Sequence, residues 1–147
     1  MAASPPIDSP PRGVLAVLAI FRNEAHAFAE FLAHYRWQGA SHFYLIDNGS
    51  TEQCTAPSCS NAPDVTWLSW PHRPVNGTSN QANAYNAHVH RVAEEWVALV
   101  DVDEFFFGVN RTLASFLHTL PSTVGQLCAP WIGFGSSGPF GLQLSRL

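Results

Sequence analysis

Apolar residues along the chain gather in short runs, and polar, turn-forming segments separate these runs. The first run is apolar throughout its eight residues, which is typical of a strand that is covered on both faces of a sheet. The later runs are shorter, and one of them alternates between apolar and polar residues. We predict strands over residues 14–21, 42–47, 65–70, 96–100 and 126–131.

Between these runs the apolar residues recur with the period of a helix. A first helix is expected over residues 24–38, where Asn23 can cap the start and Gly39 can end it. The pair Thr78 and Gln81 has the spacing of a capping box and predicts a second helix. A short third helix is expected over residues 112–119. The apolar faces of the first two helices are Phe28, Phe31, Leu32 and Tyr35, and Ala82, Tyr85, Val89, Val92, Ala93 and Trp96.

Strands that alternate with helices predict an α/β fold around a mostly parallel sheet, with helices on both faces. Residues 1–12 are rich in proline and serine and are expected to form a disordered lead-in. Residues 13–147 are long enough for one domain with a hydrophobic core of its own. We therefore expect one folded region, residues 13–147.

Charge and composition narrow the choice of partner. The net charge is −4, and the seven basic residues form no cluster, which argues against nucleic acid as a partner. The longest apolar run is too short to cross a membrane, so no membrane segment is expected. Three cysteines are too few for a disulfide framework. Cys54 and Cys59 lie close together and can either pair or remain free thiols.

Polar side chains follow three of the predicted strands at the point where each strand ends. In parallel sheets the carboxyl ends of the strands share one edge, and ligands bind in the crevice beyond that edge. These side chains are therefore expected to converge on one site. They are Arg22, Asn23 and Glu24 after the first strand, Asp47 and Asn48 after the second, and Asp101, Asp103 and Glu104 after the fourth.

The pair Asp101 and Asp103 has the spacing of a divalent-cation site. If this segment is extended, both side chains point the same way, and two close carboxylates repel each other unless a cation lies between them. The apolar flanks on either side predict a buried cluster, and burying unpaired carboxylates costs on the order of several kcal/mol. Oxygen ligands of this kind suit Mg²⁺ or Mn²⁺. The simpler interpretation is that the two acids end a strand at the surface.

Most of the other candidates also have a structural interpretation. Arg22 can be a surface charge, Glu24 can stabilise the helix dipole, and Gln81 can belong to the capping box. Asp47 with Asn48 can be a tight turn only. A glycine-rich loop can either cradle a phosphate or sugar or be a flexible turn. Its residues are Gly135, Ser136, Ser137 and Gly138.

Four motifs, taken in order, resemble glycosyltransferase family 92 and the related family-2-like transferases, which share the GT-A fold. They are residues 21–25, residues 42–51, residues 96–105, and Trp131 with residues 134–138. The resemblance implies a GT-A-like chain whose residues 13–147 bind a nucleotide sugar. It implies transfer of a sugar from a nucleoside diphosphate, a UDP-sugar in particular, to a hydroxyl of a glycan or another acceptor, with Mn²⁺ or Mg²⁺.

The resemblance also suggests roles for individual residues. Asp103 is implied as the main metal ligand, and Asp101 faces the ribose or the metal. Glu24 and Asp47 are implied to contact the base or the ribose, and Arg22, Asn23 and Asn48 belong to the same nucleotide-sugar site. Since the family continues past the Gly-Ser-Ser-Gly loop, the catalytic base is expected beyond Leu147, and the chain is expected to be a fragment.

Two alternatives remain open at this stage. The chain can be a truncated or degenerate transferase domain that binds nucleotide without turnover. A phosphatase of the haloacid dehalogenase type also uses an Asp-x-Asp motif at a strand end. In those enzymes, however, the motif normally follows the first strand, and Phe105 stands where threonine or valine is usual.

Overall fold

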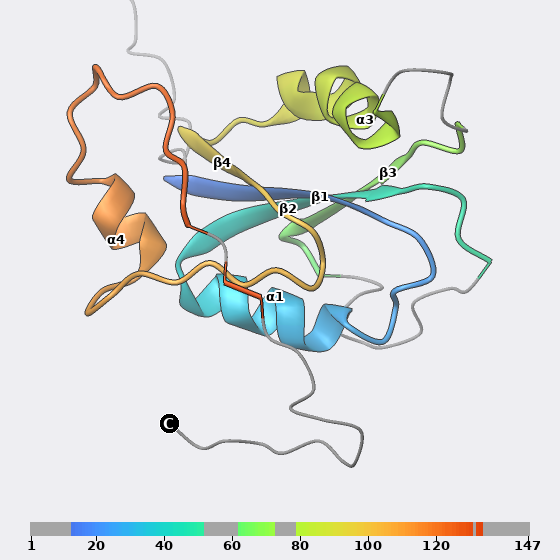
Figure 1. Cartoon of the computed structure of the whole chain (residues 1–147), viewed down its shortest axis with the longest axis horizontal. Coiled ribbons are helices and arrows are strands. Elements are labelled where there is room, and N and C mark those ends of the chain that lie inside the picture. Colours follow the sequence, from blue (N-terminus) through green and yellow to red (C-terminus); the bar gives the residue numbers. More distant parts are fainter. Residues whose placement is uncertain (1–12, 52–61, 73–78, 131, 134–147) are drawn as a thin grey trace, which may run out of the picture.

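The computed structural model describes residues 13–51, 62–72, 79–130 and 132–133. Four strands and three α-helices alternate along these residues, so the predicted α/β class is confirmed (Figure 1). A 3₁₀ turn, η1 (Val89–Arg91), follows the second of the helices. The strands are β1 (Leu15–Phe21), β2 (Ala40–Asp47), β3 (Val65–Ser69) and β4 (Trp96–Leu99), and the helices are α1 (Phe28–Trp37), α3 (Asn80–His88) and α4 (Leu113–Leu117).

The four strands form one parallel sheet in the order β3-β2-β1-β4. β1 is central and almost fully buried because it pairs with β2 on one side and with β4 on the other. In sequence order, β2 and then β3 are added on one side of β1. The chain then crosses back and places β4 on the other side of β1. The carboxyl ends of β1 and β4 therefore flank the point where the strand order reverses, which is where ligands bind in open α/β sheets.

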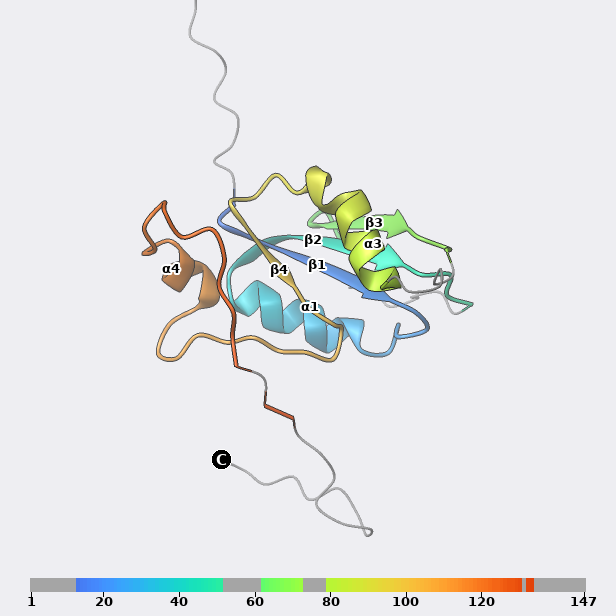
Figure 2. The ribbon, with the colours of Figure 1, turned by 45° about the horizontal axis from the view of Figure 1, so that its top comes forward.

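Helices cover both faces of the sheet, as predicted. Figure 2 shows α1 on one face and α3 on the other. Phe31, Leu32 and Tyr35 of α1 pack with Val17 and Phe43 on the first face. On the second face, a smaller core joins Ala84 of α3 to the alternate side chains of β1 and β2. The alternation of side chains along the strands produces these two cores.

The first helix begins later than the sequence predicted. α1 starts at Phe28, and Ala27 occupies its N-cap position without a side-chain hydrogen bond. Asn23 is not the cap. It adopts a positive φ of 57°, and its Oδ1 accepts a hydrogen bond from the backbone N–H of Thr51 at 2.8 Å. The predicted end is confirmed, since the helix stops before Gly39, whose φ of 87° suits glycine.

The helix after β3 is capped by Ser79, whose hydroxyl accepts a hydrogen bond from the backbone N–H of Ala82 at 3.2 Å. Thr78, the predicted cap, lies outside the described residues. The predicted apolar face is partly wrong. Ala84 is the buried residue of α3, whereas Ala82 and Val89 are exposed. α3 ends at His88, so Val92, Ala93 and Trp96 lie beyond the helix.

The chain beyond β4 contains α4, which is confirmed and is capped by Thr112. The last predicted strand is wrong, because residues 126–130 have no strand structure and their side chains are exposed. A strand requires a partner for its backbone groups, and the part of the sheet that the structure describes offers none here. Among the residues that the structure describes, no helix is both long enough and apolar enough to span a membrane.

Tyr35 of α1 ties the segment after β4 to the core. Its hydroxyl donates to the backbone oxygen of Glu104 at 2.9 Å and accepts from the backbone N–H of Phe106 at 3.0 Å. Burial raises the pKa of Tyr35 to about 12, so the hydroxyl keeps its proton and remains a donor at neutral pH. The residues that follow β4 are therefore fixed from the α1 side of the sheet.

Replacing Tyr35 by phenylalanine is expected to lower the free energy of unfolding by about 1–2 kcal/mol, because two backbone groups lose their partner. Urea denaturation measures the change. Tyr44→Phe is the comparison variant, since the Tyr44 hydroxyl makes a longer hydrogen bond, to the Glu94 side chain at 3.3 Å. Equal losses in the two variants would contradict the anchoring role of Tyr35.

Candidate functional site

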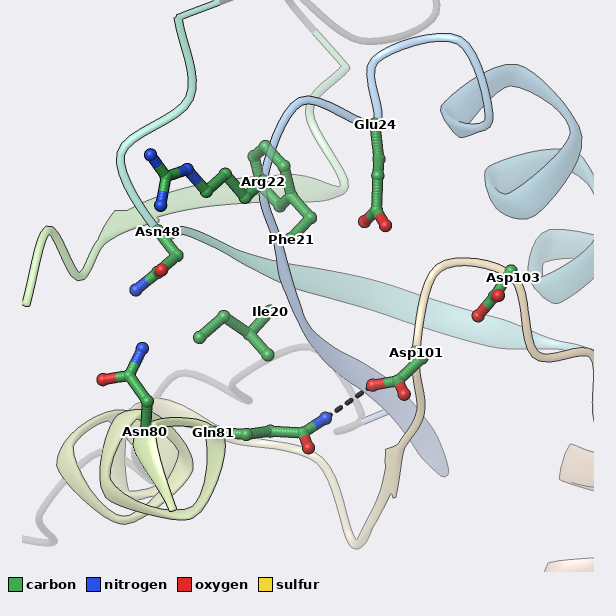
Figure 3. Close-up of a pocket in the computed structure, with 9 residues that line it drawn as sticks. All are labelled: Ile20, Phe21, Arg22, Glu24, Asn48, Asn80, Gln81, Asp101 and Asp103. Carbon is green, nitrogen blue, oxygen red and sulfur yellow. Dashed lines mark hydrogen bonds between the residues drawn. The ribbon is translucent and has the colours of Figure 1, made fainter. Parts of the chain in front are cut away.

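A pocket of about 410 Å³ opens at the carboxyl ends of β1 and β4, beside the first turn of α3. It lies at the edge of the sheet where the sequence predicted polar side chains to converge. Figure 3 shows acidic side chains at one end and amide and guanidinium groups at the other. The lining residues are Ile20, Phe21, Arg22, Glu24, Asn48, Asn80, Gln81, Asp101 and Asp103.

The acidic motif after β4 forms a turn rather than the extended segment that we assumed. The backbone N–H of Glu104 donates to the oxygen of Asp101 at 3.0 Å, and the Glu104 carboxylate accepts from the backbone N–H of Asp101 at 3.1 Å. Val102 points into the core and is only 2% exposed. The turn, and not strand alternation, directs Asp101 and Asp103 to the same pocket.

The expectation that apolar flanks bury the two acids is wrong. Asp101 and Asp103 are exposed, and so are Phe105 and Phe107, because the chain leaves the sheet at Leu99 and runs along its edge. Water therefore solvates both carboxylates, and the cost of burial does not by itself require a cation. What the structure does establish is that they line one pocket together with Glu24.

Glu24 faces the acidic turn from the end of β1 (Figure 3). Partial burial raises the pKa of Glu24 above its ordinary value of 4.5, and the negative charges of Asp103 and Asp101 raise it further. The Glu24 carboxyl is thus close enough to the acidic turn to interact with the negative charges of Asp101 and Asp103. A positive charge in this end of the pocket would relieve their mutual repulsion.

Replacing Glu24 by glutamine is expected to stabilise the metal-free chain at neutral pH. Because the folded-state pKa of Glu24 is raised, its ionised form opposes folding. The penalty is absent well below pH 4.5, grows as the pH rises through the raised pKa, and stays constant above it. The effect is small because water screens this partly exposed group. Thermal midpoints of variant and parent across this pH range measure it.

Glu95→Gln, which alters a glutamate at the opposite end of β4, is the control for the loss of one negative charge. We expect the gain of the Glu24→Gln variant over this control to appear as the pH rises above 4.5 and to be complete above the raised pKa. A gain that is the same at every pH, or no gain at all, would show that Glu24 is not coupled to the acidic turn.

Two amide side chains at the other end of the pocket are held by the loop after β3. Asn48 donates from its Nδ2 to the backbone oxygen of Trp70 at 2.7 Å, and Asn80 accepts at its Oδ1 from the indole N–H of Trp70 at 3.0 Å. Arg22, which is exposed, lies beside them (Figure 3). This end therefore offers hydrogen-bonding groups and one positive charge.

Sequence reasoning missed the contribution of α3. Asn80 was not a candidate, and Gln81 was interpreted as part of a capping box. In the structure Gln81 lines the pocket, and its Nε2 donates to the Asp101 carboxylate at 2.5 Å. A signal was present, because the helix that follows a parallel strand begins at the same edge of the sheet as the strand ends.

Two predicted site residues do not line the pocket. Asn23 holds the loop after β2, and the Asp47 carboxylate accepts from the backbone N–H of Ser50 at 2.8 Å, which closes a local turn. Both therefore shape the loops around the pocket. The predicted substrate loop, Gly135, Ser136, Ser137 and Gly138, lies outside the described residues, as do Cys54 and Cys59.

The acidic end offers carboxylate oxygens of the kind that hard divalent cations prefer. Among the residues that the structure describes, no three His, Cys, Asp or Glu side chains stand close enough together to form a metal site. Mg²⁺ is also commonly held by only one or two carboxylates together with the phosphates of a substrate. The donor set fits a cation that arrives with a phosphorylated ligand.

Comparisons with known proteins agree on one family. The sequence model described as Glycosyltransferase family 92 matches residues 15–126, which include all four strands. A glycosyltransferase family 92 protein of Oryza sativa subsp. japonica is 29% identical over 131 residues, which is 84% of this chain and 22% of that protein. No solved structure matches the chain significantly. The chain belongs to glycosyltransferase family 92.

Proposed function

We propose that this chain binds the nucleoside diphosphate part of a UDP-sugar together with Mn²⁺ or Mg²⁺. In this proposal it is the donor-binding part of an enzyme that transfers the sugar to a hydroxyl of a glycan or another acceptor. The chain spans only 22% of the length of its rice relative. Transfer as such is therefore proposed for the whole protein, and donor binding for the residues described above.

One observation carries the proposal. Three carboxylates, from Glu24, Asp101 and Asp103, meet a guanidinium and three side-chain amides in one pocket at the reversal point of a parallel sheet. A ligand that fits such a pocket has a part that binds a cation and a part that forms hydrogen bonds. A nucleoside diphosphate has both, in its pyrophosphate and in its base and ribose.

The two ends of the pocket suggest how the donor lies. The acidic end suits the pyrophosphate only when a cation neutralises the repulsion between phosphate and carboxylate oxygens. The amides of Asn48 and Asn80 suit the polar edge of a base or the hydroxyls of a ribose.

The carboxylates of the acidic turn suit a cation that is bound by the protein and the pyrophosphate together. Asp103 and Asp101 supply oxygen ligands, and the pyrophosphate supplies others. When bound, the cation would offset the charge that develops on the diphosphate as the bond to the sugar breaks. Glu24, whose raised pKa reflects the nearby negative charges, would be ionised more easily once a positive charge is present.

Calorimetric titration of the chain with UDP, with and without Mn²⁺, tests the proposal. We expect heat of binding in the presence of Mn²⁺ and a large loss of affinity when EDTA removes the metal. UMP, which lacks the second phosphate, is the matched ligand control and should gain much less from Mn²⁺. UDP binding that is indifferent to metal, or no binding under either condition, would contradict the proposal.

A further inference from the structure

Two tyrosines hold the acidic turn from opposite faces of the sheet. On the α1 side, the Tyr35 hydroxyl donates to the backbone oxygen of Glu104 at 2.9 Å. On the α3 side, the Tyr85 hydroxyl donates to the backbone oxygen of Val100, the residue before Asp101, at 3.4 Å. The backbone of the turn is thus fixed just before its first residue and at its last, whereas the direction of the Asp101 side chain needs a further contact.

Gln81 supplies that contact. Its side-chain nitrogen donates to Oδ1 of Asp101 and also to the hydroxyl of Tyr85, at 3.1 Å. Figure 3 shows the amide reaching from α3 across the floor of the pocket to the carboxylate. One oxygen of Asp101 is thus held by an amide that is itself supported by a tyrosine, and Oδ2 is left for a ligand.

A partner of this kind matters because Asp101 is exposed and its carboxylate can otherwise rotate in water. A metal-binding side chain that must become ordered on binding lowers the affinity for the cation, whereas a side chain that is already held in the bound direction does not. Groups that orient metal-binding carboxylates in this way typically change metal affinity by about 10-fold to 100-fold when they are removed.

We propose that Gln81 is a positioning residue, which holds the Asp101 carboxylate in the direction needed to bind the cation of a cation–nucleoside diphosphate complex. This inference rests on the proposed function, since it assigns Gln81 a part in the same site. It gives α3 a role beyond covering the sheet, because the helix carries the group that sets the geometry of the acidic end.

The test compares Gln81→Leu with the unaltered chain in UDP titrations with and without Mn²⁺. The quantity of interest is the ratio of the two dissociation constants, which is the gain in affinity that the metal provides. We expect Gln81→Leu to reduce this ratio by about tenfold or more, because the loss falls mainly on the titration with Mn²⁺. A purely structural role would instead lower the thermal midpoint and weaken both titrations.

Two further variants sharpen the result. Asn86→Leu removes a carboxamide from the same helix at a position that does not line the pocket, and it should leave the ratio unchanged. Tyr85→Phe removes the support of Gln81 and should reduce the ratio less than Gln81→Leu does. If the ratio for Gln81→Leu equals that of the unaltered chain, the proposed role of Gln81 is wrong, whereas the proposed function is not affected. If the parent chain itself gains nothing from Mn²⁺, the proposed function fails and this role fails with it.

Discussion

Replacing Asp103 by alanine is expected to weaken UDP binding in the presence of Mn²⁺ by at least about 100-fold, above the loss typical for a residue that only orients a ligand. The reason is that the resemblance to family 92 implies Asp103 as the main metal ligand, and that Asp103 lines the acidic end of the pocket. Metal-free UDP binding should change little, because the proposed nucleoside contacts lie at the other end. Paired calorimetric titrations with and without Mn²⁺ measure both effects.

Glu95→Ala is the matched control for this variant. It removes the same negative charge from the chain, but Glu95 precedes β4 whereas Asp103 follows it, so the two lie at opposite ends of the strand. A cation held by general attraction to an acidic chain would be weakened alike in both variants. Such an equal loss would contradict a specific site at the acidic turn, as would an Asp103→Ala variant that binds normally.

Replacing Gln38 by alanine is expected to lower the free energy of unfolding by about 3 kcal/mol or more, the largest stability loss that we predict. Gln38 is fully buried, and its Oε1 accepts hydrogen bonds from the backbone N–H groups of Leu113 at 3.0 Å and Gly108 at 3.4 Å. It thereby fixes the segment after the acidic turn to the end of α1. Urea denaturation followed by circular dichroism measures the loss.

Gln38→Met separates the two causes of that loss. Methionine keeps most of the side-chain volume but offers no acceptor comparable to the amide oxygen. We expect methionine to remove only the part of the loss that comes from the cavity. A loss of about 1–2 kcal/mol, from the missing hydrogen bonds, then remains. Gln126→Ala, which alters an exposed glutamine, should change stability by less than about 0.5 kcal/mol. Full recovery by methionine would show that the hydrogen bonds of Gln38 do no more than offset the cost of burying its Nε2, which has no hydrogen-bond partner among the described residues.

The sequence was sufficient to predict the sheet and the edge at which the site lies. Continuous apolar runs such as residues 15–19 occur where helices cover both faces of a parallel strand, and β1 is such a strand. Chain order then requires Glu24 and Asp101 to follow strands that end at the same edge. No long-range contact needs to be known for that inference, which is why it was confirmed.

The geometry within the site could not be predicted in the same way. An apolar residue between two acids fits an extended segment and a turn equally well, and only the packing of Val102 into the core decides between them. The partner of Asn23 lies 28 residues away in sequence, so local pattern favoured an N-cap that the structure does not contain. The contact between Gln81 and Asp101 was hidden for the same reason.

The false strand over residues 126–131 has a related cause. A short segment with apolar residues such as Leu127 satisfies the local preference for a strand, but a strand forms only where another strand can pair with it. Local preference therefore predicted the paired strands well but could not exclude a strand that has no partner.

A crystal structure of the chain with UDP and Mn²⁺ would show whether the acidic turn holds a cation together with the pyrophosphate. The anomalous signal of manganese identifies the ion independently of its surroundings. We predict the ion between the Asp103 carboxylate and the pyrophosphate oxygens, with the nucleoside lying toward Asn48 and Asn80. UDP bound outside this pocket, or bound within it with no manganese at Asp103, would contradict the account.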